Sequence, residues 1–486
     1  MIVINRSKTV DTFWNHWLSS SLLILDFLII AVLLPIIIMQ RRESGATLAW
    51  ALAIIFLPII GLISFWLFGT TRLYFRKRKR RKIEAALAPD LQRLKLQVNQ
   101  QSTIEGIPPN LVYLAYHLDR IGPSHGNSVK LFREGTKTFD AIETAFDEAE
   151  HHIHVMYYIW EIDTTGRRLR DALIHAVKRG VEVRVLVDDV GSRHTRHHFF
   201  KPLEQAGGKV GRFLKVNLLS RRLNINHRNH RKIIVIDGDN AFTGGMNVGD
   251  VYAGLAEPWL DLHAQIQGPV ARDLQETFCE DWFHATGENL VKNIYFPTPI
   301  IEGHVWAQFL ASGPADRRWQ AIYTMLFAAI GQATQRIWLE TPYFVPDKPL
   351  IMALQTAALR GIDVRLLLPA KSDHPLVYYA GRSFFDDLLI AGARIFEYGA
   401  SMIHAKSAVI DSHFATLGST NMDQRSFRLN FEGNLFFYDK TITEQLSTDF
   451  LKLCDNAEEV TYSKRKLLSK SERFKESTTH ILAPLL

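Results

Sequence analysis

Residues 230–247 read HRKIIVIDGDNAFTGGMN, and residues 404–421 read HAKSAVIDSHFATLGSTN. Both stretches follow the pattern H-x-K-x4-D-x6-G-[GS]-x-N. A single H-x-K arises by chance on many surface strands, whereas two full copies at corresponding places of a repeated unit do not. The duplicated motif is therefore the feature around which the fold and the chemistry of this chain are organised.

The sequence that surrounds the two copies is also duplicated. RGVEVRVLVDD at 179–189 matches RGIDVRLLLPA at 360–370, and LEQAGGKV at 203–210 matches LLIAGARI at 388–395. Aliphatic runs alternate with segments whose apolar residues recur about every 3.6 positions, so each half reads strand, helix, strand, helix, strand. The sequence predicts an α/β fold of two similar halves, each with a mixed, mostly parallel sheet flanked by helices, about a pseudo-twofold axis.

The spacing inside the motif predicts one shared site. Residues two apart on a strand point to the same face, so His230 projects with Lys232, and His404 projects with Lys406. If the halves pack about a twofold axis, both pairs converge. Imidazoles, ammonium groups and amide donors without a carboxylate cluster suit a phosphodiester, and we expect no metal and no cofactor. One neutral imidazole can attack phosphorus while the other, protonated, donates to the departing alkoxide.

The N-terminal part of the chain contains two long apolar runs. Residues 17–39 and 47–68 are each long enough to cross about 30 Å of hydrocarbon as a helix, and a short polar stretch separates them. A cleaved signal peptide fits poorly, because the first run is too long and the second follows directly. The sequence therefore predicts a two-helix transmembrane hairpin ahead of the two halves.

Positive charge is concentrated in one place. The chain has 486 residues and a net charge of +7, and eight cations without an acid lie between Arg72 and Lys82. Removing those eight charges leaves −1 for the rest, so we expect no broad basic surface for nucleic acid. A hairpin puts both chain ends on one side of the membrane, and the basic cluster predicts that this side is cytoplasmic. The cluster can also bind anionic lipid headgroups.

These features divide the chain into five predicted segments. They are a transmembrane hairpin at 1–70, a basic membrane-proximal connector at 71–127, the two halves at 128–295 and 296–462, and a basic and apolar tail at 463–486. A terminal segment that combines cations with a final apolar run either lies on the membrane surface or is disordered. The sequence of the tail favours neither alternative.

Several histidine and aromatic residues have two interpretations. HHIH at 151–154 and RHTRHH at 193–198 could suggest a metal site, but no Asp, Glu or Cys stands at ligand spacing, so we expect solvated histidines. Four aromatic residues could line an acyl groove, although we expect them in the sheet core: Tyr157, Trp160, Tyr343 and Phe344.

The duplicated motif resembles the signature of the phospholipase D superfamily, and the likeness runs from Ser128 to Phe450. The bacterial cardiolipin synthases are similar throughout, since they also have a two-span hairpin, a basic connector and two motif-bearing halves. The resemblance implies that a phosphatidyl group passes between two phosphatidylglycerol molecules through a covalent phosphohistidine, giving cardiolipin and glycerol. Two alternatives stay open, a membrane-anchored phospholipase D hydrolase and a phosphodiesterase that acts on nucleic acid.

The same resemblance implies roles for single residues. His230 is the expected nucleophile, and His404 is the expected general acid and then base. Asp261 in WLDL and Glu432 in NFEGN are expected to orient the histidines. Gly245 stands where the superfamily usually has serine, which leaves a hydroxyl contact to phosphate in doubt. The remaining motif residues are expected to bind the phosphate or to support the site: Lys232, Lys406, Asn247, Ser419, Asn421, Asp237 and Asp411.

The resemblance also implies partners and a location. We expect phosphatidylglycerol and other anionic phospholipids as partners, and no nucleic acid, for a multi-pass protein of the bacterial inner membrane with its catalytic part in the cytoplasm. A non-catalytic lipid-binding scaffold is disfavoured, because every His, Lys and Asn of the motif is present. The acceptor alcohol, the balance of transfer and hydrolysis, and the oligomeric state stay open.

Overall fold

A computed structural model describes residues 6–40, 44–65, 103–119, 122–195, 197–215, 227–257, 259–301, 303–314 and 320–483. The chain divides into two units, Met1–Arg76 and Lys77–Leu486. The predicted basic cluster from Arg72 to Lys82 lies outside the described residues.

The N-terminal unit is helical. It contains α1 (Arg6–Met39), α2 (Ser44–Phe56) and α3 (Pro58–Ser64). Pro58 begins α3 and divides the second apolar run, since proline is tolerated in the first turn of a helix but not in its interior. Many of its large apolar side chains are exposed, such as Leu23 at 70% and Phe27 at 71%. Over the described ranges of the chain, no helix combines the length and the apolar character that a membrane crossing requires.

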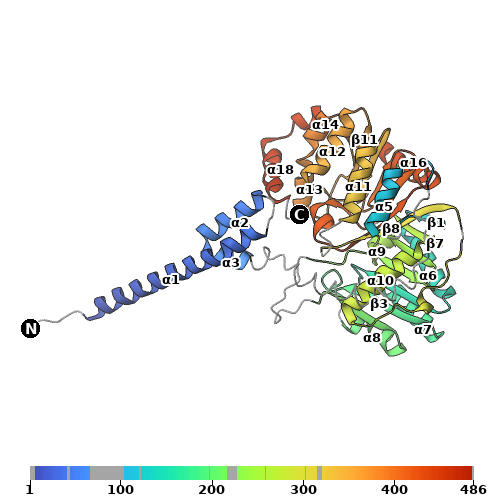
Figure 1. Ribbon diagram of the computed structural model, residues 1–486, viewed down its shortest axis with the longest axis horizontal. Helices are drawn as coiled ribbons and strands as arrows, with labels where there is room; N and C mark the ends of the chain where they lie inside the picture. Colours follow the sequence, from blue (N-terminus) through green and yellow to red (C-terminus); the bar gives the residue numbers. More distant parts are fainter. Residues whose placement is uncertain are drawn as a thin grey trace, which may run out of the picture. The chain divides into compact units, whose positions relative to one another are not determined.

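One continuous sheet runs through the second unit, with the first half in cyan to green and the second in yellow to red (Figure 1). In the described residues it has fifteen strands, in the order β17-β12-β11-β9-β13-β14-β16-β8-β1-β7-β6-β5-β2-β3-β4. At its centre β1 (Ser124–Phe132) pairs antiparallel with β8 (Val305–Ser312). Outward from this pair the two halves follow the same order, as a twofold relation between them requires.

The strands of the two halves correspond one to one. The first half contributes β7 (His263–Gln267), β6 (Asn240–Gly244), β5 (Ile233–Ile236), β2 (His152–Tyr157), β3 (Glu182–Asp188) and β4 (Lys209–Phe213). The second half contributes β16 (Glu432–Phe437), β14 (Phe414–Gly418), β13 (Ser407–Ile410), β9 (Arg336–Glu340), β11 (Asp363–Pro369) and β12 (Arg394–Tyr398), with β17 (Ala457–Val460) at the edge. A separate parallel pair joins β10 (Phe344–Val345) to β15 (Met422–Asp423).

Successive strand residues face two different cores. Ile233 and Val235 of β5 face a central core shared by both halves, with α10 (Ala271–Thr286) and α16 (Lys440–Asp455). Ile234 and Ile236 face an outer core of the first half. The outer helices of the first half are α6 (Gly135–Glu148), α7 (Thr164–Lys178) and α8 (His197–Ala206). Those of the second half are α5 (Pro109–Asp119), α11 (Ala321–Gln332), α12 (Lys348–Leu359), α13 (Pro375–Arg382) and α14 (Phe385–Ile390).

The α/β class and the two similar halves are confirmed, but the prediction of mostly parallel sheets is wrong. Within the fifteen-stranded sheet of the described residues, only β2, β3 and β4, and their counterparts β9, β11 and β12, run parallel. Helical crossovers such as α7 join those strands, whereas the motif strands β5 and β6, and β13 and β14, are joined by tight turns. Asp237 and Asp411 adopt φ of 52° and 51° in these turns. Each motif is therefore a hairpin, which imposes antiparallel pairing.

The C-terminal tail is part of the folded second unit. It forms α17 (Tyr462–Lys466) and α18 (Lys470–Leu482). Arg465 is 2% exposed and lies 2.6 Å from Asp386 Oδ1 and 2.7 Å from Glu476 Oε1. The alternative of a disordered tail is therefore wrong for the described residues.

Replacing Arg465 with alanine is expected to destabilise the second unit. The change leaves Glu476, itself 5% exposed, without its main cation, and breaking a buried ion pair from one side costs about 3–5 kcal/mol. Thermal unfolding in detergent would measure the loss. Arg394→Ala is the matched control, because its pair with Glu459 is exposed and is worth about 0–1 kcal/mol. Equal midpoints for the two variants would contradict the expectation.

Candidate active site

Each motif segment is held by the opposite half. The His230 N–H donates to Phe431 O (2.8 Å), and the Phe431 N–H donates to Arg228 O (2.8 Å). In the same way, the His404 N–H donates to Leu260 O (2.7 Å). These contacts bring the two motif copies together, as the sequence predicts for halves that pack about a twofold axis.

Each imidazole lies against a buried carboxylate of the other half. His230 Nδ1 is 3.0 Å from Glu432 Oε2, and His404 Nδ1 is 2.6 Å from Asp261 Oδ2. Both carboxylates are fully buried. A proton on Nδ1 is needed for each of these contacts, so Nε2 of each ring is left to react with a substrate. The sequence identifies both acids, but the motif does not reveal that each one serves the histidine of the opposite half.

The two carboxylates are supported differently. Ser419 Oγ donates to Glu432 Oε2, and Asn430 Nδ2 donates to Glu432 Oε1 (3.2 Å). At the position that matches Ser419, Gly245 has no side chain, and a Cβ there would lie 2.0 Å from Asp261 Oδ1. Glycine is required because the Asp261 carboxylate occupies that space. The Ser419 hydroxyl is committed to Glu432 rather than directed toward a phosphate.

Two lysines are buried beside the histidines. Lys232 Nζ donates to His230 O (2.7 Å), and Lys406 Nζ donates to His404 O. Burial, together with the charge of Lys406, lowers the pKa of Lys232 to about 7. Burial lowers the pKa of Lys406 to about 8, against the opposing effect of Asp261. Burial and mutual repulsion disfavour the charged form of both lysines. A bound anion would stabilise their charge, so binding of an anion here is favourable.

The surroundings of the two imidazoles favour their neutral form. Burial lowers the pKa of His230, although the Glu432 carboxylate opposes the shift. Burial and the charges of Lys406 and Lys232 lower the pKa of His404 well below 6.5. The negative charge of a bound phosphodiester would raise the pKa of both. A neutral nucleophile is thus available at rest, and an acid becomes available when the anion binds.

The two motif asparagines have different environments. Asn247 Oδ1 accepts from the Ile159 N–H (3.3 Å), and its Nδ2 donates to the Tyr252 hydroxyl (2.9 Å). Asn421 Oδ1 and Thr420 Oγ1 are buried without a hydrogen-bond partner in the described part of the chain. The first asparagine therefore fixes the local fold, whereas the second half keeps polar atoms available to a ligand.

The motif aspartates lie at the other end of the hairpins from the histidines. Asp237 accepts hydrogen bonds at 2.8 Å from the N–H groups of Glu150, His151 and His152. Asp411 accepts in the same way from the N–H groups of Thr334, Gln335 and Arg336. Both carboxylates therefore tie the motif turns to the starts of β2 and β9. The structure does not bring them to the histidines.

Aromatic rings pack against both histidines. The Tyr158 ring lies 4.9 Å from the His230 ring, and the Tyr252 and Trp259 rings lie 5.4 Å and 5.2 Å from the His404 ring. Sequence analysis missed these three residues. Trp259 could have been predicted from the sequence. It lies two residues before Asp261, and residues two apart on an extended segment point to the same side.

Tyr343 is the exception among the four aromatic residues predicted to lie in the sheet core. The other three are buried: Tyr157, Trp160 and Phe344. Tyr343 is half-buried, and its hydroxyl donates to both carboxylate oxygens of Asp373, at 2.8 Å and 2.9 Å.

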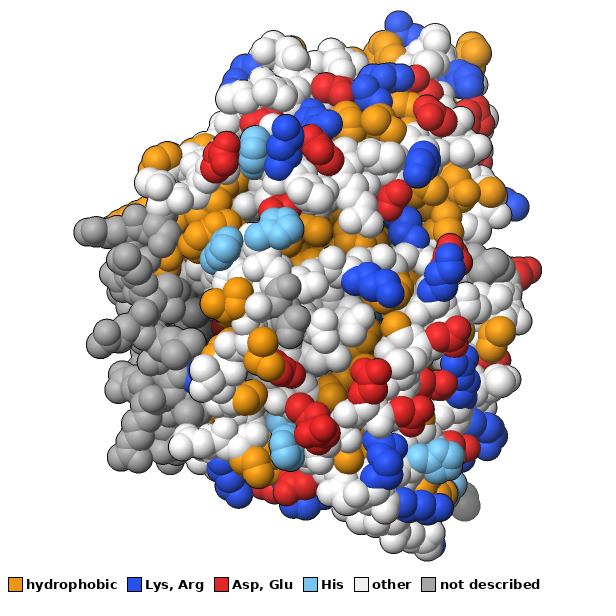
Figure 2. Space-filling view, turned by 90° about the vertical axis from the view of Figure 1, so that its right-hand side faces the viewer, with side chains coloured by type: hydrophobic (Ala, Val, Ile, Leu, Met, Phe, Trp, Pro, Cys, Tyr) orange, Lys and Arg blue, Asp and Glu red, His pale blue; other side chains and the backbone are white. Residues whose placement is uncertain are grey.

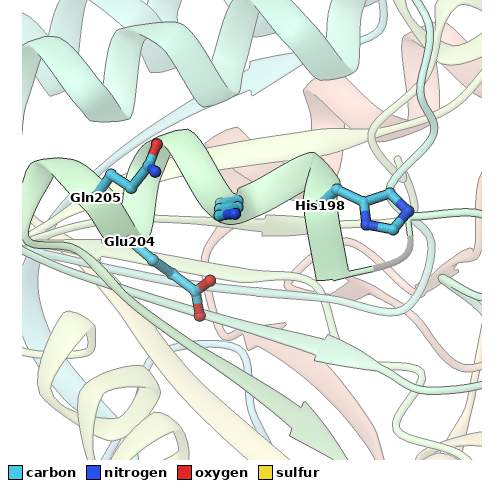
Figure 3. A pocket seen from close by; sticks show the side chains of 4 residues that line it. His198, Glu204 and Gln205 are labelled. Carbon is cyan, nitrogen blue, oxygen red and sulfur yellow. The ribbon is translucent and has the colours of Figure 1, made fainter.

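The prediction of solvated histidines is wrong for His152 and His154. They are 1% and 0% exposed, because β2 lies inside the sheet and both of its faces are covered. In the described ranges, no three His, Cys, Asp or Glu side chains are placed to hold a metal ion. An open depression on α8 is lined by His198, Lys201, Glu204 and Gln205 (Figure 3). It contains no motif residue, and we assign it no role.

Comparisons with known proteins agree with this geometry. A family model described as "Cardiolipin synthase, PLD-like domain" matches residues 142–282 and 326–454, and a model described as "Phospholipase_D-nuclease N-terminal" matches residues 27–69. The major cardiolipin synthase of Bacillus subtilis is 38% identical and covers 96% of this chain and 99% of its own. A cardiolipin synthase of Geobacillus thermodenitrificans is 39% identical over 93% and 91%.

A solved structure shares the fold. Phosphatidylserine synthase of Haemophilus influenzae superposes with a TM-score of 0.58 at 14% identity, covering 74% of this chain and 95% of that chain. The family match spans both motif copies, and the two curated relatives align over almost the full length. The chain therefore belongs to the family of phospholipase D-type cardiolipin synthases, which are phosphatidyltransferases.

Proposed function

We propose that this enzyme transfers a phosphatidyl group from one phosphatidylglycerol to the glycerol headgroup of a second, giving cardiolipin and glycerol. The observation that carries the proposal is the pair of imidazoles, each bound through Nδ1 to a carboxylate of the opposite half, beside two buried lysines. This arrangement provides a nucleophile, a proton donor and an anion site within one cluster of polar groups. All three are needed to exchange one alcohol for another at phosphorus.

In the first step His230 Nε2 attacks the phosphorus of the donor lipid. The N–P bond forms as the P–O bond to glycerol breaks, and His404 Nε2–H gives its proton to the departing alkoxide. Lys232 and Lys406 stabilise the charge on the non-bridging oxygens. The products of this step are phosphatidyl-His230 and free glycerol, with His404 neutral.

In the second step a hydroxyl of another phosphatidylglycerol attacks the same phosphorus. His404 takes the hydroxyl proton, the new O–P bond forms, and the N–P bond to His230 breaks. Cardiolipin leaves with His404 protonated again, so the cycle balances. The acid of the first step acts as the base of the second.

The surroundings of the two carboxylates favour His230 as the nucleophile. A phosphorylated imidazole carries positive charge, which an ionised carboxylate stabilises. Although burial alone would raise it, the pKa of Glu432 is lowered by His230, Lys232 and the Ser419 hydroxyl. Burial raises the pKa of Asp261, which has no such hydroxyl beside it. Glu432 is therefore the better partner for a covalent intermediate.

We also propose that residues 1–70 form a transmembrane hairpin in the bacterial inner membrane, with the catalytic part in the cytoplasm. The exposed apolar side chains of the N-terminal unit and the basic cluster after it support this location. Both lipid substrates would then lie in the bilayer that anchors the enzyme. We propose the same division for the rest of the chain as the sequence predicts. The connector spans 71–127, the two halves span 128–295 and 296–462, and the tail spans 463–486.

A hydrolase or a nuclease built on the same motif is the competing function. A nuclease needs a broad basic surface. On the face shown in Figure 2, blue cationic and red anionic side chains are interspersed rather than gathered into one basic band. A hydrolase would place water, rather than a second lipid, at the phosphorus.

The product assay separates these functions. Detergent-solubilised enzyme with phosphatidylglycerol alone is expected to give cardiolipin and glycerol in equal amounts, measured by mass spectrometry and a glycerol assay. Phosphatidic acid without cardiolipin would favour the hydrolase. His230→Ala and His404→Ala are each expected to lower turnover by at least roughly 10³-fold, since removing a nucleophile or its acid–base partner has effects of that size. Full turnover in either variant would contradict the assigned roles.

Gly245→Ala is expected to inactivate the enzyme. The added methyl group lies where Asp261 Oδ1 now is, so Asp261 must leave the His404 imidazole. Loss of an orienting carboxylate costs up to about 10⁴-fold in turnover. Gly331→Ala is the matched control, because a Cβ there meets nothing within 4 Å. Equal turnover for both variants would show that Asp261 does not position His404.

The pH dependence of kcat/KM reports the free enzyme. An ammonium group is charged below its pKa and loses its charge above it. Because the pKa of Lys232 is about 7 and that of Lys406 is about 8, kcat/KM is expected to fall as pH rises through 7 to 8. Lysines with an ordinary pKa near 10.5 would sustain the rate to about pH 10. A flat profile up to pH 9 would contradict the lowered values.

A further inference from the structure

A hydrogen-bonded tyrosine–carboxylate pair lies beside the motif of the second half. The Tyr343 hydroxyl donates to both oxygens of Asp373, at 2.8 Å and 2.9 Å. The Tyr343 ring also packs on His374, with the ring centres 5.6 Å apart. Ser372 Oγ also donates to Asp373 Oδ1 (3.4 Å), and His374 Nε2 lies 3.6 Å from Oδ2, but the Asp373 side chain remains 31% exposed, so a ligand can reach the carboxylate. A rigid tyrosine thus holds a carboxylate in one orientation without satisfying it fully.

The backbone ties this pair to the second motif. Tyr343 precedes Phe344, which pairs with Met422 through the short strands β10 and β15. Met422 directly follows Asn421, and the Met422 N–H donates to Thr341 Oγ1 (3.3 Å). The loop that carries Asp373 follows β11, at the carboxyl end of the parallel strands, where α/β sheets bind their ligands.

The charge of Asp373 acts on the reacting groups of the same side. It raises the pKa of His404 and of Lys406 against the larger lowering effect of burial, so it lies within electrostatic range of both. It also acts on Tyr252, whose ring packs against His404. On this side of the site, the Tyr252 and Trp259 rings pack against His404, and the Asp373 carboxylate lies within electrostatic range of it.

A carboxylate on the side of the acid–base histidine can accept a hydrogen bond from an alcohol. We propose that Asp373, held by Tyr343, is the acceptor subsite, where the carboxylate accepts a hydrogen bond from the hydroxyl next to the attacking one. The ligand class is a vicinal diol, such as the glycerol headgroup. This inference rests on the proposed transfer reaction and identifies what selects its acceptor.

The subsite favours transfer over hydrolysis. In the second step the attacking hydroxyl gives its proton to His404, its oxygen bonds to phosphorus, and the N–P bond to His230 breaks. A diol whose second hydroxyl binds Asp373 is held in line for this attack. Water has no second hydroxyl that could bind Asp373 in the same way. Sites built to bind a hydroxyl reject analogues that lack it by up to about 10⁴-fold.

A competition among soluble alcohols tests the subsite. Full-length enzyme in mixed micelles receives phosphatidylglycerol with 1,2-propanediol, 1,3-propanediol or 1-propanol, and the phosphatidyl alcohols and phosphatidic acid are quantified by mass spectrometry. The unmodified enzyme is expected to prefer the vicinal diol. In Asp373→Ala the preference for 1,2-propanediol over 1-propanol is expected to fall at least roughly tenfold, and phosphatidic acid to rise relative to transfer products.

Two further variants refine the comparison. Asp373→Asn keeps the shape but removes the charge, and Tyr343→Phe removes the hydroxyl that orients the carboxylate, so each is expected to lose part of the preference. They also keep the test decisive if the alanine variant does not fold. Glu148→Gln and Tyr113→Phe are matched controls on exposed helix surfaces and are expected to keep the full preference.

The outcomes separate the two proposals. If the unmodified enzyme forms neither cardiolipin nor phosphatidyl alcohols, the transferase function fails and the subsite fails with it. If it forms both, and the Asp373 and Tyr343 variants keep its alcohol preference, only the subsite is overturned. A lost preference in these variants, with the controls unchanged, supports the subsite.

Discussion

The crossed pairing of each histidine with a carboxylate of the opposite half is the constraint on which the rest of the site depends. The contact of His230 with Glu432 joins residues that are 202 positions apart in the sequence, and that of His404 with Asp261 joins residues 143 positions apart. Neither half alone holds a complete imidazole–carboxylate pair. The central antiparallel contact of β1 with β8, which fixes the halves in one sheet, is thus a requirement of the chemistry as well as of the fold.

The duplication makes the two halves similar, but the proposed reaction needs one histidine as the nucleophile and the other as the acid and base. Both halves repeat the His-Lys pair, but they differ around it. Glu432 is supported by Ser419 and Asn430, whereas Asp261 lies where a serine side chain would have to be. A nucleophile needs an ionised carboxylate to stabilise its charged intermediate, while an acid–base group needs a ring that takes up and releases a proton. Small changes next to each carboxylate are enough to divide these two tasks.

The motif made much of the structure predictable. Its duplication predicted two similar α/β halves and one shared site, because spacing along strands carries that information, whereas Asp261 and Glu432 were predicted only from the family resemblance. The direction of the motif strands was mispredicted. Aliphatic runs such as those of β5 and β13 look the same whether the neighbouring strand is parallel or antiparallel, and only the turns at Asp237 and Asp411 decide it. Tyr158, Tyr252 and Asp373 were missed since they lie outside the motif, Tyr252 in the short helix Asp250–Ala253 and the other two in loops.

The two buried lysines explain why selectivity for the alcohol has to come from residues outside the motif. Lys232 and Lys406 are costly to keep charged in the empty site, and any phosphodiester that enters relieves this cost. The donor lipid and cardiolipin both carry such a group, so the lysines cannot distinguish substrate from product. The alcohol is the part that changes in the reaction. In the proposed mechanism, discrimination falls to groups on the His404 side, where Tyr252 and Trp259 pack against the imidazole and Tyr343 holds Asp373.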